Sequence, residues 1–85
     1  MSHHPTNFVG DPVVAIKQAV EAAIADSRCE ASGGGGHFHI TVTSAAFAGQ
    51  SLLNKQRMVL NAIAHLMKGD AAPVHAVDTL ITNLP

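Results

Sequence analysis

Residues 37–60 have the sequence HFHITVTSAAFAGQSLLNKQRMVL, which combines a strand-like pattern with a helix-like pattern. Its first eight residues alternate between polar and apolar side chains, which is typical of a β-strand with one buried face. The apolar positions are Phe38, Ile40 and Val42, and the polar positions are His37, His39, Thr41 and Thr43. After a loop at residues 45–50, apolar residues recur at spacings of three and four, which predicts a helix. Ser51 can cap this helix, and Gly69 and Pro73 end it.

The residues before and after this stretch supply three more elements. Asp11 and Pro12 predict the start of a first helix, because a carboxylate can cap it and proline fits its first position. Apolar spacing carries that helix to about Ala25. A weak, short strand is predicted at residues 28–32, and the glycines at 33–36 form a flexible connector. A last strand is predicted at residues 74–82, which are rich in β-branched side chains.

The order helix, strand, strand, helix, strand predicts an α+β fold. We expect the first two strands to pair as a hairpin through the glycines. The third strand follows a helix, so we expect it to pair parallel to one of the other two. The result is a three-stranded mixed sheet with both helices packed on one face. The other face, with the polar residues of the 37–44 strand, is either wet or covered by a partner.

Composition limits the chain to one small domain. The 85 residues suffice for a single core, which we place at residues 11–85 after a flexible arm at residues 1–10. A net charge of −1 counts against non-specific binding to nucleic acid. Only 13% of the residues are charged, so either Ala and Thr cover the surface or part of it lies against a partner.

No apolar run reaches the roughly 20 residues of a membrane span, and no signal peptide is evident. We therefore expect a cytoplasmic protein, or an organellar one if a presequence was removed.

The glycine run and the single cysteine carry little chemistry by themselves. The run at 33–36 is not followed by the helix and Lys-Ser/Thr pair of a phosphate-binding loop, so a linker is the better interpretation. Cys29 lies between two charged residues, and strand alternation then favours an inward, buried thiol over a reactive one.

The histidines and the paired cations leave alternatives open. His3 and His4 near the terminus lack a fixed geometry for a metal ion. His75 lies at a strand end, where a partly buried imidazole can either bind a metal or serve as a satisfied core histidine. Lys55 and Arg57 on the second helix either meet a phosphate or carboxylate, or belong to a solvated face.

Four motifs in order make the chain resemble the BolA family. They are His-Phe before a β run, Ser-x-x-Phe-x-Gly at residues 44–49, Leu-x-Lys-x-Arg-Met-Val at residues 53–59, and Val-His-Ala at residues 74–76. The resemblance covers residues 12–80 and is nearest to the glycine-loop branch of the family. It implies a fold related to class II KH domains, which agrees with the order of elements predicted above.

The resemblance also implies a function. BolA-like proteins are non-enzymatic partners of monothiol glutaredoxins, and they act in iron–sulfur cluster trafficking and iron regulation. The family's C-terminal histidine corresponds to His75, which would be this chain's main ligand to a 2Fe–2S cluster shared with the glutaredoxin and glutathione. Many members supply a second ligand from the loop before the His-Phe strand, where this chain has only glycines. Cys29 and His37 are the two candidates for that role, and His37, Lys55 and Arg57 are expected near the partner.

A second hypothesis is a nucleic-acid-binding transcriptional regulator that uses the KH-like fold, with the second helix as reader. The net charge of −1 and the lack of a GxxG loop between two helices weigh against it. A second copy of the chain is a further candidate partner.

Overall fold

Every predicted helix and strand is present, and their predicted order is confirmed. The computed structural model describes residues 10–85. Its elements are α1 (Pro12–Ala23), β1 (Ser27–Gly34), β2 (His37–Ser44), α2 (Leu52–Ala62) and β3 (Ala76–Asn83), with short 3-10 helices η1 (Ala45–Phe47) and η2 (Ala64–Leu66). The arm predicted at residues 1–10 lies outside the described residues except for Gly10, and so do His3 and His4. Among residues 10–85, no helix has the length and apolar character to cross a membrane.

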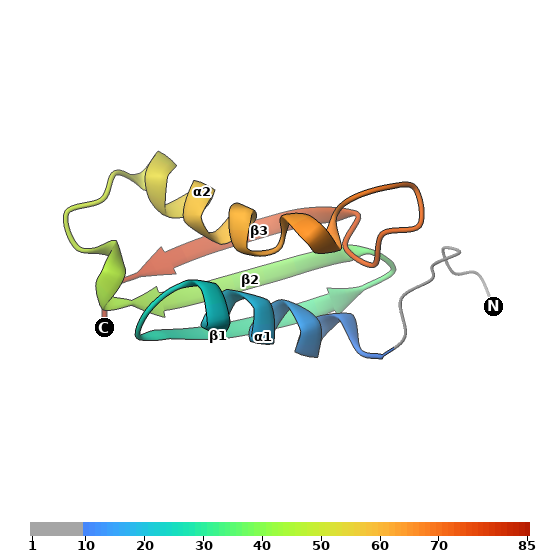
Figure 1. Ribbon diagram of the computed structural model, residues 1–85, viewed down its shortest axis with the longest axis horizontal. Helices are drawn as coiled ribbons and strands as arrows, with labels where there is room; N and C mark the ends of the chain where they lie inside the picture. The colour runs from blue at the N-terminus through green and yellow to red at the C-terminus, as the bar shows by residue number, and fades with distance from the viewer. Residues whose placement is uncertain (1–9) are drawn as a thin grey trace.

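The three strands form one mixed sheet in the order β1-β2-β3. β1 and β2 are antiparallel, and β3 runs parallel to β2, as predicted. Both helices lie on the same face of this sheet, with α1 beside β1 and α2 beside β3 (Figure 1). The turn between β1 and β2 and the start of β3 therefore lie at the same end of the sheet (Figure 1).

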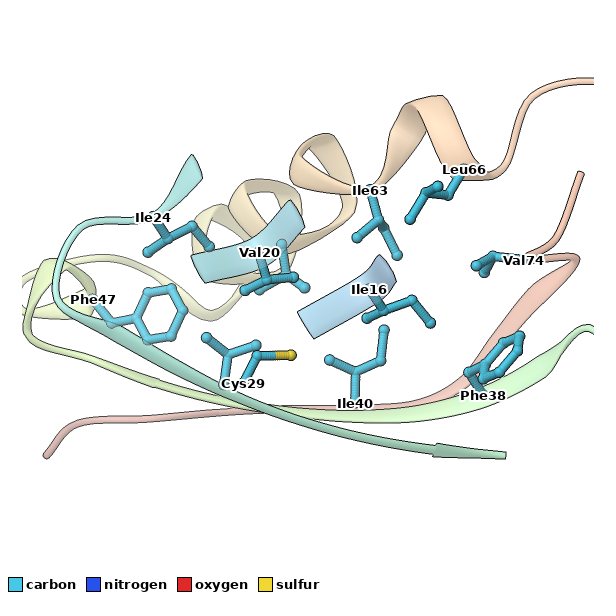
Figure 2. Packing of buried hydrophobic residues seen from close by; sticks show 12 residues of the cluster. Ile16, Val20, Ile24, Cys29, Phe38, Ile40, Phe47, Ile63, Leu66 and Val74 are labelled. Atoms are coloured by element: carbon cyan, nitrogen blue, oxygen red, sulfur yellow. The ribbon is translucent and has the colours of Figure 1, made fainter. Parts of the chain in front are cut away.

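The core lies between the sheet and the two helices, as Figure 2 shows. Phe38, Ile40 and Val42 all point into it, which confirms the face predicted from the alternation. α1 contributes the buried residues Ile16 and Val20, and α2 contributes Val59. Ile63, which directly follows α2, is also buried in this core. Burying such a side chain contributes roughly 1.5–3 kcal/mol, so this face sets the orientation of β2. The polar residues of β2 are consequently turned to the open face of the sheet.

Several predicted boundaries differ from those in the structure by a few residues. α1 ends at Ala23 rather than Ala25, because Ile24 adopts an extended backbone and Asp26 has a φ of 50°. α2 ends at Ala62, and a 3-10 turn to Leu66 replaces its last predicted turn before Gly69. β3 begins at Ala76, two residues later than predicted.

β1 is longer than its composition suggested, because it includes two of the four glycines. Gly33 and Gly34 pair with Phe38 and His37, so ladder hydrogen bonds to β2 offset their weak strand propensity. The connector is therefore a tight two-residue turn rather than a flexible linker. Gly35 and Gly36 have φ values of 62° and 84°, and two successive positive φ angles are typical of a type I′ hairpin turn.

Candidate functional site

His75 lies immediately before β3, at the end of the sheet where the β1–β2 turn is located. Its backbone N–H donates to the carbonyl of Gly36 over 2.8 Å, and the N–H of Ala76 donates to the same carbonyl over 2.9 Å. The preceding Val74 is fully buried, and its N–H donates to the carbonyl of Leu66 over 3.1 Å. Hydrogen bonds to Gly36 and to Leu66 therefore hold the backbone of residues 74–76 in place. The side chain of His75 is exposed, so the expectation of a partly buried imidazole was wrong.

His37 is the nearest candidate ligand to His75. It is the first residue of β2, where it pairs in register with Ala76. The two imidazole rings have centroids 5.9 Å apart and are tilted by 55°. Both side chains lie on the surface, where a partner can reach them. The structure therefore brings together two of the histidines that the sequence singled out.

Asp78 lies beside His37 on the open face of the sheet, and the sequence patterns did not identify it as a candidate. Its Oδ1 lies 3.2 Å from Nδ1 of His37. The register shifts between Phe38 and His39, which pair with Val77 and Thr79, so Asp78 is the extra residue of a bulge in β3. An acidic residue three positions after His75 is visible in the sequence, but its contact with His37 depends on the bulge.

The next polar pair on the same face has a different chemistry. Nδ1 of His39 lies 2.9 Å from the hydroxyl Oγ1 of Thr79. A hydroxyl can donate or accept, so this contact leaves both tautomers of His39 available.

Cys29, the other candidate for a second ligand, lies away from His75. It is 1% exposed and points into the core, as predicted for a buried thiol (Figure 2). Burial, with a smaller contribution from the Glu21 charge, raises the pKa of its thiol to about 11. Cys29 pairs with Val42, which lies five residues after His37 in β2. Five residues of a strand span roughly 17 Å. It also faces the opposite side of the sheet, so the structure does not bring it to the histidine pair.

Lys55 and Arg57 lie in the first two turns of α2. α2 begins at the opposite end of the sheet from the start of β3, which directly follows His75 (Figure 1). The 11 residues of α2 rise roughly 16 Å along its axis. Lys55 and Arg57 therefore lie away from the pair of His37 and His75.

The histidine pair makes an incomplete metal site. Among residues 10–85, no group of three or more His, Cys, Asp or Glu side chains is arranged to bind a metal ion. Neutral imidazole is a good ligand for iron and zinc, and these metals take four or more ligands in proteins. A metal bound at this corner would need further ligands from a second molecule.

Comparisons with known proteins give a consistent result. A family model described as BolA-like protein matches residues 16–82. A BolA protein homologue from Coxiella burnetii is 35% identical, with a TM-score of 0.74, and the match covers 89% of this chain and 94% of that one. BolA1 from Mus musculus is 30% identical, with a TM-score of 0.67 and coverage of 100% and 76%. The BolA domain of SufE1 from Arabidopsis thaliana shares the fold at 21% identity, with a TM-score of 0.74 and coverage of 92% and 96%. The search of curated proteins found no match.

Proposed function

Because the chain belongs to the BolA-like family, we propose that it is a non-enzymatic partner of a monothiol glutaredoxin in iron–sulfur cluster trafficking. In this proposal, His75 donates a ligand to a 2Fe–2S cluster that the two proteins share with glutathione. One observation carries it: two exposed imidazoles lie with their ring centroids 5.9 Å apart, and among the described residues they belong to no group of three or more side chains that could hold a metal ion alone.

The incomplete coordination supports a shared cluster over a resident one. Two imidazoles from one protein can replace two cysteines on one iron of a 2Fe–2S cluster, and this replacement raises the reduction potential. The remaining ligands would then come from the glutaredoxin cysteine and glutathione. The cluster is thus cargo that passes through the complex, and the chain alone would not retain it.

The state of Cys29 supports a binding role over a catalytic one. It is the only cysteine in the sequence, and it is buried. A thiol with its pKa raised to about 11 is almost entirely protonated at neutral pH, and the protonated form is a poor nucleophile. The chain therefore has no activated thiol for redox chemistry of its own.

Reconstitution tests the proposal. The chain is mixed with a monothiol glutaredoxin, glutathione, ferrous iron and sulfide, and the product is followed by visible absorption and circular dichroism. We expect His75→Ala to change the spectrum and to accelerate cluster loss to a chelator. His65→Ala removes another exposed histidine, on η2, and serves as the matched control. Identical spectra and identical cluster loss for the wild type and His75→Ala would overturn the role of His75.

A further inference from the structure

We infer that Asp78 is a positioning residue that sets the tautomer of His37 and so makes its Nε2 the second ligand from this chain. The inference rests on the proposed function, because it names the second ligand of the same cluster. It starts from the contact between Nδ1 of His37 and Oδ1 of Asp78, at 3.2 Å.

This contact determines which ring nitrogen of His37 carries the proton. An ionised carboxylate only accepts hydrogen bonds, so Nδ1 of His37 must be the donor. In the neutral ring, the lone pair then resides on Nε2. A free imidazole side chain in water favours the opposite tautomer, with the proton on Nε2 and no lone pair there. Asp78 therefore selects the form of His37 that can bind a metal through Nε2.

The same arrangement is common in metalloproteins. Metal-binding histidines usually donate their second ring N–H to a carboxylate or carbonyl, which orients the ring and raises its basicity. His37 has this partner, whereas His39 bonds a hydroxyl that leaves its tautomer open. Of the two candidates for second ligand, His37 also lies beside His75, while Cys29 faces the core.

The backbone explains why Asp78 can reach His37. The bulge in β3 lets Asp78 and Thr79 both lie on the open face, one beside His37 and the other beside His39. The side chains of His37 and Asp78 are 52% and 46% exposed. An exposed hydrogen bond of this kind contributes little to folding, so its substitution can be studied without unfolding the protein.

The tautomer is tested first, in the chain without metal or partner. Long-range ¹H–¹⁵N NMR spectra at mildly alkaline pH, where imidazoles are neutral, distinguish the two forms. We expect His37 to carry its proton on Nδ1 in the wild type and on Nε2 in Asp78→Ala. Asp78→Asn keeps a carbonyl acceptor and should retain the wild-type form. Thr79→Val is the matched control and should leave His37 unchanged. A proton on Nε2 in the wild type, or no change in Asp78→Ala, overturns the inference.

The ligand role is tested in the reconstituted glutaredoxin complex. Pulsed EPR of the reduced cluster detects ¹⁴N couplings from bound imidazoles. We expect two histidine couplings in the wild type and one in His37→Ala. Cluster loss to a chelator should accelerate about tenfold or more in Asp78→Ala, as is typical when such a partner is removed, and stay near the wild-type rate in Asp78→Asn and Thr79→Val.

The outcomes separate the two proposals. A wild-type complex with a single histidine coupling, unaffected by His37→Ala, overturns the role of His37 and leaves the proposed function standing. Failure of the wild type to assemble any cluster overturns the proposed function itself, and the ligand role with it.

Discussion

The backbone carbonyl of Gly36 accepts a hydrogen bond from the backbone N–H of His75, with an N···O distance of 2.8 Å. Gly36 is the second residue of the β1–β2 turn, so this bond ties the hairpin to the start of β3. The pair of His37 and His75 therefore depends on the shape of a turn built from glycine. A substitution that distorts the hairpin beside this turn is expected to disturb the candidate site as well as the fold.

Gly33→Ala should destabilise the protein by about 2–4 kcal/mol, because it combines backbone strain with a steric clash. Gly33 has a φ of 128°, and a Cβ there would lie 2.2 Å from the carbonyl oxygen of His37. Gly34→Ala is the matched control, since its Cβ would meet nothing within 4 Å and its change in stability should stay below about 1 kcal/mol. Urea unfolding measures both values. An effect of Gly33→Ala as small as that expected for Gly34→Ala would show that the hairpin tolerates a side chain at Gly33.

Glu21→Gln should lower stability at neutral pH and remove part of the acid sensitivity. The Glu21 carboxylate accepts a hydrogen bond from the backbone N–H of Cys29 at 2.9 Å and pairs with Lys17 at 2.6 Å. These contacts, the first more strongly, lower its pKa from the ordinary 4.5. The stabilisation is therefore present above about pH 4.5 and is lost as the pH falls through the lowered value. Urea unfolding from pH 7 to pH 3 should show the wild type and Glu21→Gln converging at the acid end, and a gap that stays constant would contradict this.

Cys29 should make the wild type lose stability between about pH 9 and pH 11. In the unfolded chain the thiol ionises near its ordinary pKa of 9.0, but burial raises the folded pKa to about 11. Over that interval the folded state binds more protons, so the free energy of unfolding falls with rising pH, by about 1–3 kcal/mol. Cys29→Ala lacks this component, and comparing the two pH profiles isolates it from lysine titration. Disulfide-reagent labelling at pH 8 should also be slow until denaturant is added, and fast native labelling would refute the buried thiol.

Thr82→Val should stabilise the protein by about 1 kcal/mol. Among the described residues, the hydroxyl of Thr82 is buried without a hydrogen-bond partner. Valine has nearly the same shape and removes the cost of that unpaired group. Thr79→Val removes an exposed hydroxyl that bonds His39, so its effect should be within about 0.5 kcal/mol. Thermal unfolding checks both, and a lower melting temperature for Thr82→Val would contradict the assignment.

The faces of the sheet and the order of its elements followed from local patterns. Phe38, Ile40 and Val42 alternate along one strand with polar residues, so their side chains point into the core. The side chains of His37 and His39 therefore point to the other face. The buried state of Cys29 could be predicted for the same reason. Such patterns act over a few residues, because side-chain direction in a strand or helix depends only on the local backbone period.

The composition of the candidate site depended on relationships between distant residues. The sequence placed His75 at an end of the last strand and His37 on the polar face of the strand at residues 37–44. Only the folded chain shows that these two rings lie 5.9 Å apart, that Asp78 reaches His37, and that Cys29, Lys55 and Arg57 lie elsewhere. The physical reason is strand register. Cross-strand hydrogen bonds and a single bulge align residues some 40 positions apart, and no periodicity within one segment encodes that alignment.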